Sequence, residues 1–322
     1  MNTWHIHIQG RVQGVGFRPN IYRLASKKKI NGVVYNDLNG VHIRFEAKKE
    51  TAIPFYNAVL DGAPNLAKIT GHTLSEIGNQ SFEDFQILQS QEVKTTALML
   101  PPDFALCESC RKEILSSGNR RALYPFTTCT DCGPRFSLIN NLPYEREFTA
   151  MDEFKMCETC KEEYTNPKNH RYHSQTNSCT TCGVRLFLKN SKGEEIVNDT
   201  SKILKKVIDF WQKGKIVAIK GIGGYLLTCD ATNATSVRIL RERKNRPSKP
   251  FACMYPNVEL LRREFHINSS EIEMLSGEVA PIVLFKLKND RTNIALNEVA
   301  PNLDQIGVML PYTPLYELLM QS

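Results

Sequence analysis

Alternating hydrophobic and polar positions mark the first element of the chain. Trp4, Ile6 and Ile8 alternate with polar neighbours, which predicts a half-buried β-strand. A helix with Pro19 in its first turn is expected next, because proline suits that position and an apolar stripe continues at helical spacing. The dipeptide Asn31-Gly32 is expected to end that helix.

The next segments return to a strand pattern. Residues 41–46 alternate between apolar and polar side chains, and Asn39-Gly40 is a hairpin turn signal. A second helix is predicted near 51–60 and a last strand near 82–88. The order β-α-β-β-α-β predicts a ferredoxin-like α/β sandwich.

The rest of the chain divides into a linker and two further blocks. Residues 91–104 form a mixed polar linker, and residues 105–187 have little long apolar periodicity. In the block 198–322, an amphipathic helix is predicted around 203–211 and short buried strands at 215–220 and 281–287. Strands separated by helical stretches indicate an α/β domain, so the chain as a whole is expected to be a multidomain α/β protein with a first domain over 1–90.

Composition and charge exclude few functions, but they indicate where in the cell the protein is expected. The net charge of +7 is compatible with an anionic substrate or with nucleic acid and decides neither. No apolar run approaches the roughly 20 residues that span a bilayer, and polar residues interrupt any signal-peptide core. We therefore expect a cytoplasmic protein without a membrane partner.

Eight of the ten cysteines form four CxxC pairs, which in a cytosolic chain points to metal. The pattern CxxC-x18-CxxC over 107–132 recurs 50 positions later over 157–182, an internal duplication. Four thiolates complete a tetrahedral shell, so two structural zinc ions are predicted. The predicted ligands are Cys107, Cys110, Cys129, Cys132, Cys157, Cys160, Cys179 and Cys182.

The pairing of these knuckles stays open at this point. Each repeat could hold its own ion, or the knuckles could interleave between repeats. His170 and His173 have no counterpart in the first repeat, so we treat both as non-ligands. Cys229 and Cys253 stand alone and are expected to be small buried hydrophobic residues.

The stretch "GRVQGVGFRP" (10–19) places glycines and an arginine between a predicted strand and helix. Backbone N–H groups of such a turn form an anion cradle, and Arg18 adds a fork of donors that fits two phosphate oxygens. The alternative is a tight turn with a solvated arginine. The stretch is neither a Walker loop nor a dinucleotide fingerprint, because no Gly-Lys-Ser/Thr follows and Pro19 stands where a third glycine would be needed.

Together with "VYNDLNGVHIRFE" (34–46), this stretch resembles the signature pair of the acylphosphatase family. The resemblance implies that loop amides and Arg18 bind the phosphate of an acyl phosphate while Asn36 orients the attacking water. Without that arginine, Asn36 would be read as a turn residue that starts the hairpin. The implied phosphate-binding residues are Gln13, Gly14, Val15, Gly16, Phe17 and Arg18.

Two stretches of the last block, "KGIGGYLLTCDA" (220–231) and "RERKNRPSKPFACM" (241–254), resemble YrdC-type nucleotide-binding domains. The second could also be a solvated charge run, although Pro247 and Pro250 favour an irregular loop. Leu226 stands where related sequences often carry histidine, so no polar role is assigned there. The implied nucleotide-binding residues are Lys220, Gly223, Gly224, Tyr225, Lys244, Arg246 and Lys249.

The order acylphosphatase, duplicated CxxC block, YrdC-like domain resembles the N-terminal portion of the HypF family of hydrogenase-maturation carbamoyltransferases. That resemblance implies an enzyme that hydrolyses carbamoyl phosphate and forms carbamoyl-adenylate from ATP, with Mg²⁺ expected. It also implies transfer of the carbamoyl group to the C-terminal cysteine of a HypE-type acceptor, as the precursor of the hydrogenase cyanide ligands.

Two further expectations concern the extent and the class of the protein. The YrdC-like domain is expected to be truncated at its C-terminus and to bind ATP weakly, because no Ser/Thr-Gly/Ala-Asn motif ends the sequence. The alternative function is a zinc-containing RNA-binding or tRNA-modifying YrdC-type protein. Nucleic acid is not the expected partner, because the basic residues are not interleaved with stacking aromatics.

Overall fold

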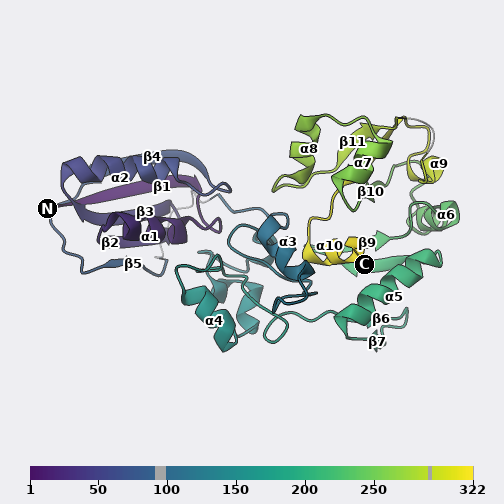
Figure 1. The fold of residues 1–322 in the computed structure, drawn as a ribbon, viewed down its shortest axis with the longest axis horizontal. Coiled ribbons are helices and arrows are strands. Elements are labelled where there is room, and N and C mark those ends of the chain that lie inside the picture. The colour runs from purple at the N-terminus through teal and green to yellow at the C-terminus, as the bar shows by residue number, and fades with distance from the viewer. Residues whose placement is uncertain (91–98, 289–291, 322) are drawn as a thin grey trace. The chain divides into compact units, whose positions relative to one another are not determined.

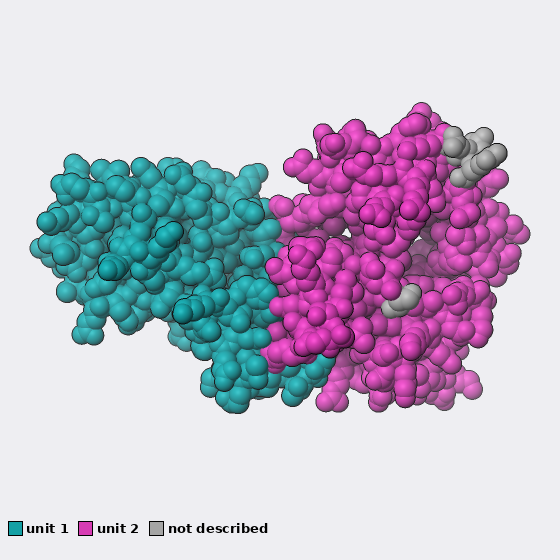
Figure 2. All heavy atoms as spheres, in the orientation of Figure 1, with its two compact units in different colours: residues 1–103, 128–182 teal, residues 104–127, 183–322 magenta. Residues whose placement is uncertain are grey.

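A computed structural model of the chain describes residues 1–90, 99–288 and 292–321 (Figure 1). Positions 91–98 of the predicted linker therefore lie outside the described residues. The chain forms two compact units, one of residues 1–103 and 128–182 and the other of residues 104–127 and 183–322 (Figure 2). Among the described helices, none combines the length and the apolar character needed to cross a membrane.

The first unit contains a five-stranded sheet with the strand order β4-β1-β3-β2-β5. Alternation along β1 and β3 buries Ile6, Ile8 and Ile43 completely, and the ring of Phe45 on β3 packs edge-on against Phe55 on α2 at 4.8 Å. The ferredoxin-like order is confirmed. The elements are β1 (Asn2–Arg11), α1 (Phe17–Lys28), β2 (Gly32–Asp37), β3 (Gly40–Ala47), α2 (Lys49–Asp61), β4 (Lys68–Glu76) and β5 (Phe85–Ile87).

The sequence analysis was wrong about the end of this sandwich. The predicted last strand near 82–88 is β5, an additional strand that pairs parallel to β2. The strand that completes the β-α-β-β-α-β order is β4, antiparallel to β1, and it was missed. Its residues are exposed or half-buried, because it forms an edge of the sheet, so it lacks the strong apolar alternation of a central strand.

Helix α1 begins at Phe17, after Gly16 in the left-handed conformation (φ 75°), so Pro19 lies in its first turn as predicted. The other end of the helix differs from the prediction. The helix ends at Lys28, where Lys29 adopts φ 53° and closes the last turn, so Asn31-Gly32 lies beyond the helix. In the hairpin, Asp37 pairs with Gly40, which leaves Leu38 and Asn39 as the turn.

The two cysteine repeats share one local structure. Helices α3 (Glu108–Leu115) and α4 (Glu158–Thr165) each begin directly after a first cysteine, with Cys107 and Cys157 as their N-caps. Leu123 and His173, at matching positions, adopt nearly the same left-handed backbone, with φ 57° and 56°. Short 3₁₀ turns between the repeats are Phe136–Leu138, Arg146–Phe148 and Ala150–Glu153.

The second unit contains a three-stranded sheet in the order β10-β12-β11, in which β10 and β12 are parallel. Phe265, Phe285 and Ile306 belong to its buried core. Helix α10 packs against α3 and α5. The helices of this unit after α3 are α5 (Thr200–Gln212), α6 (Ala234–Arg243), α7 (Val258–Glu264), α8 (Ser269–Ser276), α9 (Leu296–Val299) and α10 (Pro314–Gln321).

The predicted helix near 203–211 and the two predicted strands of this block are present, but the strands are not buried throughout, because Ala218 is exposed and Leu284 is 59% exposed. They are α5, capped by the side chain of Asp199, together with β8 and β11. Strand β8 pairs with β9 in a separate two-stranded sheet, and β6 pairs with β7 in another. The strands are β6 (Leu188–Lys189), β7 (Glu195–Val197), β8 (Val217–Lys220), β9 (Tyr225–Thr228), β10 (Ala252–Met254), β11 (Val283–Lys286) and β12 (Gln305–Met309).

Candidate active site

The glycine-rich stretch forms a loop between β1 and α1. Gly14 and Gly16 adopt φ 67° and 75°, a backbone region that glycine reaches easily because it has no Cβ, which explains their placement here. Arg18 lies in the first turn of α1 and is only 7% exposed. Its burial argues against the alternative of a solvated arginine on a tight turn.

The loop is fastened to the end of β2 by Gln13. The Gln13 side-chain nitrogen donates to the backbone oxygen of Asp37 at 2.6 Å and, more weakly, to that of Gly40 at 3.4 Å. Because this amide is held by two carbonyls, its oxygen is left as an acceptor. The bonds bring the loop beside Asn36, which is 2% exposed on β2.

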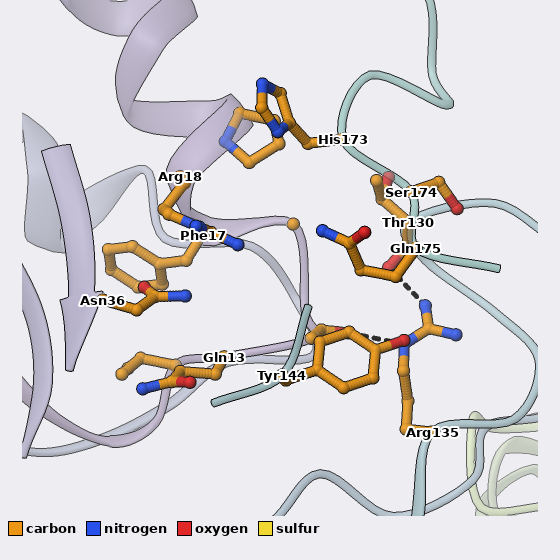
Figure 3. Close-up of a pocket in the computed structure, with 14 residues that line it drawn as sticks. Gln13, Phe17, Arg18, Asn36, Thr130, Arg135, Tyr144, His173, Ser174 and Gln175 are labelled. Atoms are coloured by element: carbon orange, nitrogen blue, oxygen red, sulfur yellow. Dashed lines mark hydrogen bonds between the residues drawn. The ribbon is translucent and has the colours of Figure 1, made fainter. Parts of the chain in front are cut away.

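Arg18 and Asn36 line one cavity of about 30 Å³ in the first unit (Figure 3). Of the implied phosphate-binding residues, Val15 is not among those lining it, and its side chain is fully buried. The side-chain oxygen of Asn36 is buried and has no hydrogen-bond partner among the described residues. The other lining residues of the loop and helix are Val12, Gln13, Gly14, Gly16, Phe17 and Pro19.

The opposite wall of the cavity comes from the cysteine block, which sequence reasoning did not connect to this site. The residues are Thr130, Arg135, Tyr144, His173, Ser174 and Gln175. A difference between the two repeats in the sequence points to some of these residues. At positions 173–175 the second repeat reads His-Ser-Gln, whereas the first repeat reads Leu-Tyr-Pro at 123–125. Polar residues in only one copy indicate a role beyond holding the metal.

Arg18 forms an ion pair with Glu145, which lies between the two repeats. The Arg18 guanidinium and a Glu145 carboxylate oxygen are 2.6 Å apart, and the side chains are 8% and 15% exposed. Ser90 donates to the same oxygen at 2.5 Å, and the Gln175 amide donates to the other oxygen at 2.9 Å. This network fixes the arginine in place, since each carboxylate oxygen is itself held.

The electrostatic environment keeps His173 neutral. Burial, and secondarily the positive charge of Arg18, lower the pKa of His173 to about 4, although Glu145 opposes the shift. Its ring packs against Tyr164 and Tyr172, with centroid distances of 5.2 and 4.6 Å. At neutral pH the wall of the cavity therefore presents an uncharged imidazole beside the arginine.

Arg135 connects the cavity to the first repeat. Its Nε donates to the backbone oxygen of Gly14 at 2.7 Å, and its two terminal nitrogens donate to the carbonyls of Cys129 and Cys132 at 3.0 and 2.9 Å. Arg135 is 2% exposed. The backbone around two predicted zinc ligands is thus bonded to the same guanidinium as the loop.

The eight CxxC cysteines form two groups of four, and each group belongs to one repeat. Within each group the sulfur atoms all lie within 4.8 Å of one another. In the second group, Cys157–Cys179 and Cys179–Cys182 are 3.8 Å apart and Cys160–Cys182 are 3.6 Å apart. A tetrahedron with Zn–S bonds of about 2.3 Å has edges of about 3.8 Å, so these residues fit zinc, and neither group includes His170 or His173.

The implied nucleotide-binding residues fall into two sets. The first set surrounds the turn after β8, where the Gly221 N–H donates to the Gly224 oxygen at 2.8 Å and Gly223 adopts φ 75°. The Lys220 ammonium lies 5.0 Å from the centre of the Tyr225 ring, which is 68% exposed. This set offers backbone amides, one cation and one aromatic face.

The second set lies on the loop that follows α6, where Lys244 caps the helix. Arg246 is fixed by this loop, because it donates to the Lys249 and Pro250 carbonyls at 3.0 and 2.5 Å and packs 5.1 Å from the centre of the Phe251 ring. Lys244 and Lys249 are exposed. The loop is irregular, as its two prolines predict, and the structure orders Arg246 but leaves the lysines at the surface.

Protein-family models match the three blocks of the chain separately. Residues 4–87 match the Acylphosphatase family model, and residues 106–139 and 156–189 match the HypF finger model. Residues 209–322 match the Sua5/YciO/YrdC model, described as Telomere recombination. An acylphosphatase of Pseudothermotoga lettingae is 40% identical over 89 residues, which cover 27% of this chain and 99% of that protein.

Longer relatives match the chain from end to end. Carbamoyltransferase HypF of Synechocystis is 43% identical over 322 residues, all of this chain and 42% of that protein. A crystal structure of full-length HypF in its phosphate- and nucleotide-bound form superposes with a TM-score of 0.92 at 38% identity, over 99% of this chain and 41% of that one. The chain belongs to the HypF family.

Within that family the match covers part of each relative. The crystal structure of T. kodakarensis HypF superposes with a TM-score of 0.87 at 38% identity, over 100% of this chain and 41% of that one. The probable carbamoyltransferase HypF of Methanocaldococcus jannaschii is 44% identical over 98% of this chain and 41% of its own length. The chain therefore spans about two fifths of the length of the HypF relatives it matches, and its acylphosphatase-like, finger and YrdC-like parts are all present.

Proposed function

We propose that this chain hydrolyses carbamoyl phosphate to carbamate and phosphate, as the first step of a carbamoyl transfer for hydrogenase maturation. One observation carries the proposal. The loop after β1, Arg18 and Asn36 meet at one buried cavity that is bounded by donors suited to a phosphoryl group. HypF relatives named as carbamoyltransferases support the choice of a carbamoyl substrate.

Hydrolysis of the acyl phosphate by water requires little covalent chemistry from the protein. A water oxygen attacks phosphorus, the bond between phosphorus and the acyl oxygen breaks, carbamate leaves, and the water proton passes to a phosphoryl oxygen of the substrate. The transition state is loose and spreads charge over the phosphoryl oxygens, so positioning and charge stabilisation dominate. Arg18 and the loop amides supply the charge stabilisation.

Asn36 is assigned to the water. Its buried side-chain oxygen lacks a partner among the described residues, so it can accept a hydrogen bond from the attacking water without breaking an existing one. Figure 3 draws the Asn36 side chain reaching from β2 toward the loop.

The remaining steps concern the YrdC-like part. We propose that this part binds ATP with Mg²⁺ through Lys220, the 221–224 turn, Arg246 and its neighbouring lysines, and that carbamoyl-adenylate forms there. We further propose that the carbamoyl group is then transferred to the C-terminal cysteine of a HypE-type acceptor. Two zinc ions, held by thiolates that require reducing conditions, favour a cytoplasmic location.

The test is phosphate release from carbamoyl phosphate by the full chain. Arg18→Ala is expected to lower kcat/KM by about 10²–10³ or more, because it removes a preorganised charged donor. Arg23→Ala is the matched control, since Arg23 lies exposed on the same helix and donates to the Pro167 carbonyl. Hydrolysis by Arg18→Ala at the rate of Arg23→Ala would rule out the assigned site.

A further inference from the structure

Three buried polar side-chain atoms without a partner among the described residues line the same cavity. They are the side-chain oxygens of Gln13 and Asn36 and the hydroxyl of Tyr144, and the three residues are 1%, 2% and 4% exposed. A buried polar group that lacks a partner is costly, so a cluster of such groups around one cavity indicates a ligand that completes them. Gln13 and Asn36 belong to the acylphosphatase motif, whereas Tyr144 does not.

Tyr144 comes from the segment between the two cysteine repeats. Its ring packs directly on the phosphate-binding loop, since a Cβ added at Gly14 would lie 3.3 Å from Tyr144 Cδ1 and Cε1. Figure 3 shows the ring beside the loop, between Gln13 and Arg135. The ring is therefore held against the loop at Gly14, and the hydroxyl lies on the Arg135 side of the ring (Figure 3).

The three atoms differ in what they can bind. The oxygens of Gln13 and Asn36 are acceptors, so they cannot bind an ionised phosphoryl oxygen. A phenol can donate its proton to such an oxygen, and donors to charged acceptors form the stronger hydrogen bonds. Burial raises the pKa of Tyr144, so the hydroxyl keeps its proton at neutral pH.

We propose that Tyr144 is a further substrate-binding residue, whose O–H donates to a phosphoryl oxygen of the bound acyl phosphate. This inference rests on the proposed function, because it assigns a third kind of donor to the same site beside Arg18 and the loop amides. It makes the cysteine block a direct contributor to substrate binding. A purely packing role for the ring is the alternative.

The affinity of the full chain for inorganic phosphate distinguishes a substrate-binding role of Tyr144 from a purely packing role. Tyr144→Phe keeps the ring on Gly14 and removes only the hydroxyl. We expect the Kd for inorganic phosphate, measured by calorimetry, to rise about tenfold or more, as for the loss of a hydrogen bond to a charged group. The melting temperature should not fall, because the hydroxyl has no partner in the structure to lose. Tyr316→Phe, a buried tyrosine of the second unit, should leave the Kd unchanged.

Arg18→Ala distinguishes failure of this inference from failure of the proposed function. Loss of phosphate binding in Arg18→Ala with wild-type affinity in Tyr144→Phe would overturn the role of Tyr144 alone. Unchanged affinity in Arg18→Ala would overturn the site itself. Should Tyr144→Phe fail to fold, an ultraviolet difference titration of the wild-type chain with phosphate replaces it. A saturable change in tyrosine absorbance that Arg18→Ala lacks supports the hydrogen bond, and its absence overturns it.

Discussion

Arg135 donates from Nε to the backbone oxygen of Gly14 at 2.7 Å, and so joins the first cysteine repeat to the phosphate-binding loop. Its terminal nitrogens hold the carbonyls of Cys129 and Cys132. A metal ion that holds these cysteines would therefore also hold Arg135 in place, and with it the hydrogen bond to Gly14. The first four-cysteine group and the cavity beside Arg18 are connected through one buried guanidinium.

This connection predicts a joint loss of metal and activity. Cys129→Ser should release one of two zinc ions and lower kcat/KM for carbamoyl phosphate by about tenfold, because Arg135 and then Gly14 lose their fixed partners. Elemental analysis and phosphate release measure the two effects. Cys229→Ser, outside both four-cysteine groups, should keep both ions and full activity. A Cys129→Ser chain with one ion and undiminished activity would contradict the connection.

Asn36→Ala tests the positioning of water. Because Asn36 is assigned to the water and not to the phosphate, kcat should fall by about 10²–10³ while the Kd for inorganic phosphate stays within about twofold of wild type. Steady-state kinetics and phosphate calorimetry measure the two quantities. The hydrogen bond proposed here would be wrong if phosphate affinity fell in parallel with kcat.

Glu145→Gln tests the carboxylate beside Arg18. The neutral amide keeps an oxygen that can accept from Arg18, but it removes a negative charge next to the expected anion. We expect phosphate to bind about tenfold more tightly, on the scale of a partly screened charge pair, and the gain to shrink at high salt. Calorimetry at two salt concentrations measures it, with Glu147→Gln on the exposed neighbouring turn as the control. Weaker phosphate binding in Glu145→Gln would instead make the carboxylate a required support for Arg18.

The His173 side chain predicts a pH dependence of stability. Its pKa is about 4 in the folded chain, mainly because of burial, against about 6.5 when unfolded. The unfolded state therefore binds more protons between these values, so this contribution is fully present above pH 6.5 and is lost as the pH falls toward 4. The loss approaches about 1.4 kcal/mol per pH unit in the middle of the window.

Denaturant unfolding at pH 5 and pH 7 checks this dependence. His173→Leu, which introduces the residue type found at Leu123 in the first repeat, should flatten the pH dependence by that amount. Because burial is the largest cause, the difference between the two proteins should persist in high salt. Identical slopes for the wild-type and variant chains would contradict the assigned cause.

The parts predicted well from the sequence depend on local signals. The loop around Arg18 and the CxxC repeats are short motifs, in which a few neighbouring residues determine the chemistry. The edge strand β4 was missed because half-exposed residues carry little alternation. The contacts of Arg18 with Glu145, and of Gly14 with Tyr144, join residues more than a hundred positions apart, and no local pattern encodes such packing.

The duplicated cysteine repeat has a consequence for how such a site can be altered. Both copies hold four cysteines in the same spacing, and both reach the cavity, the first through Thr130 and the second through His173, Ser174 and Gln175. The residues between the cysteines can therefore differ between the copies, as they do at 123–125 and 173–175, while the four-cysteine arrangement is kept. Residues 173–175 can therefore be substituted to change the lining of the cavity without replacing any of the eight cysteines.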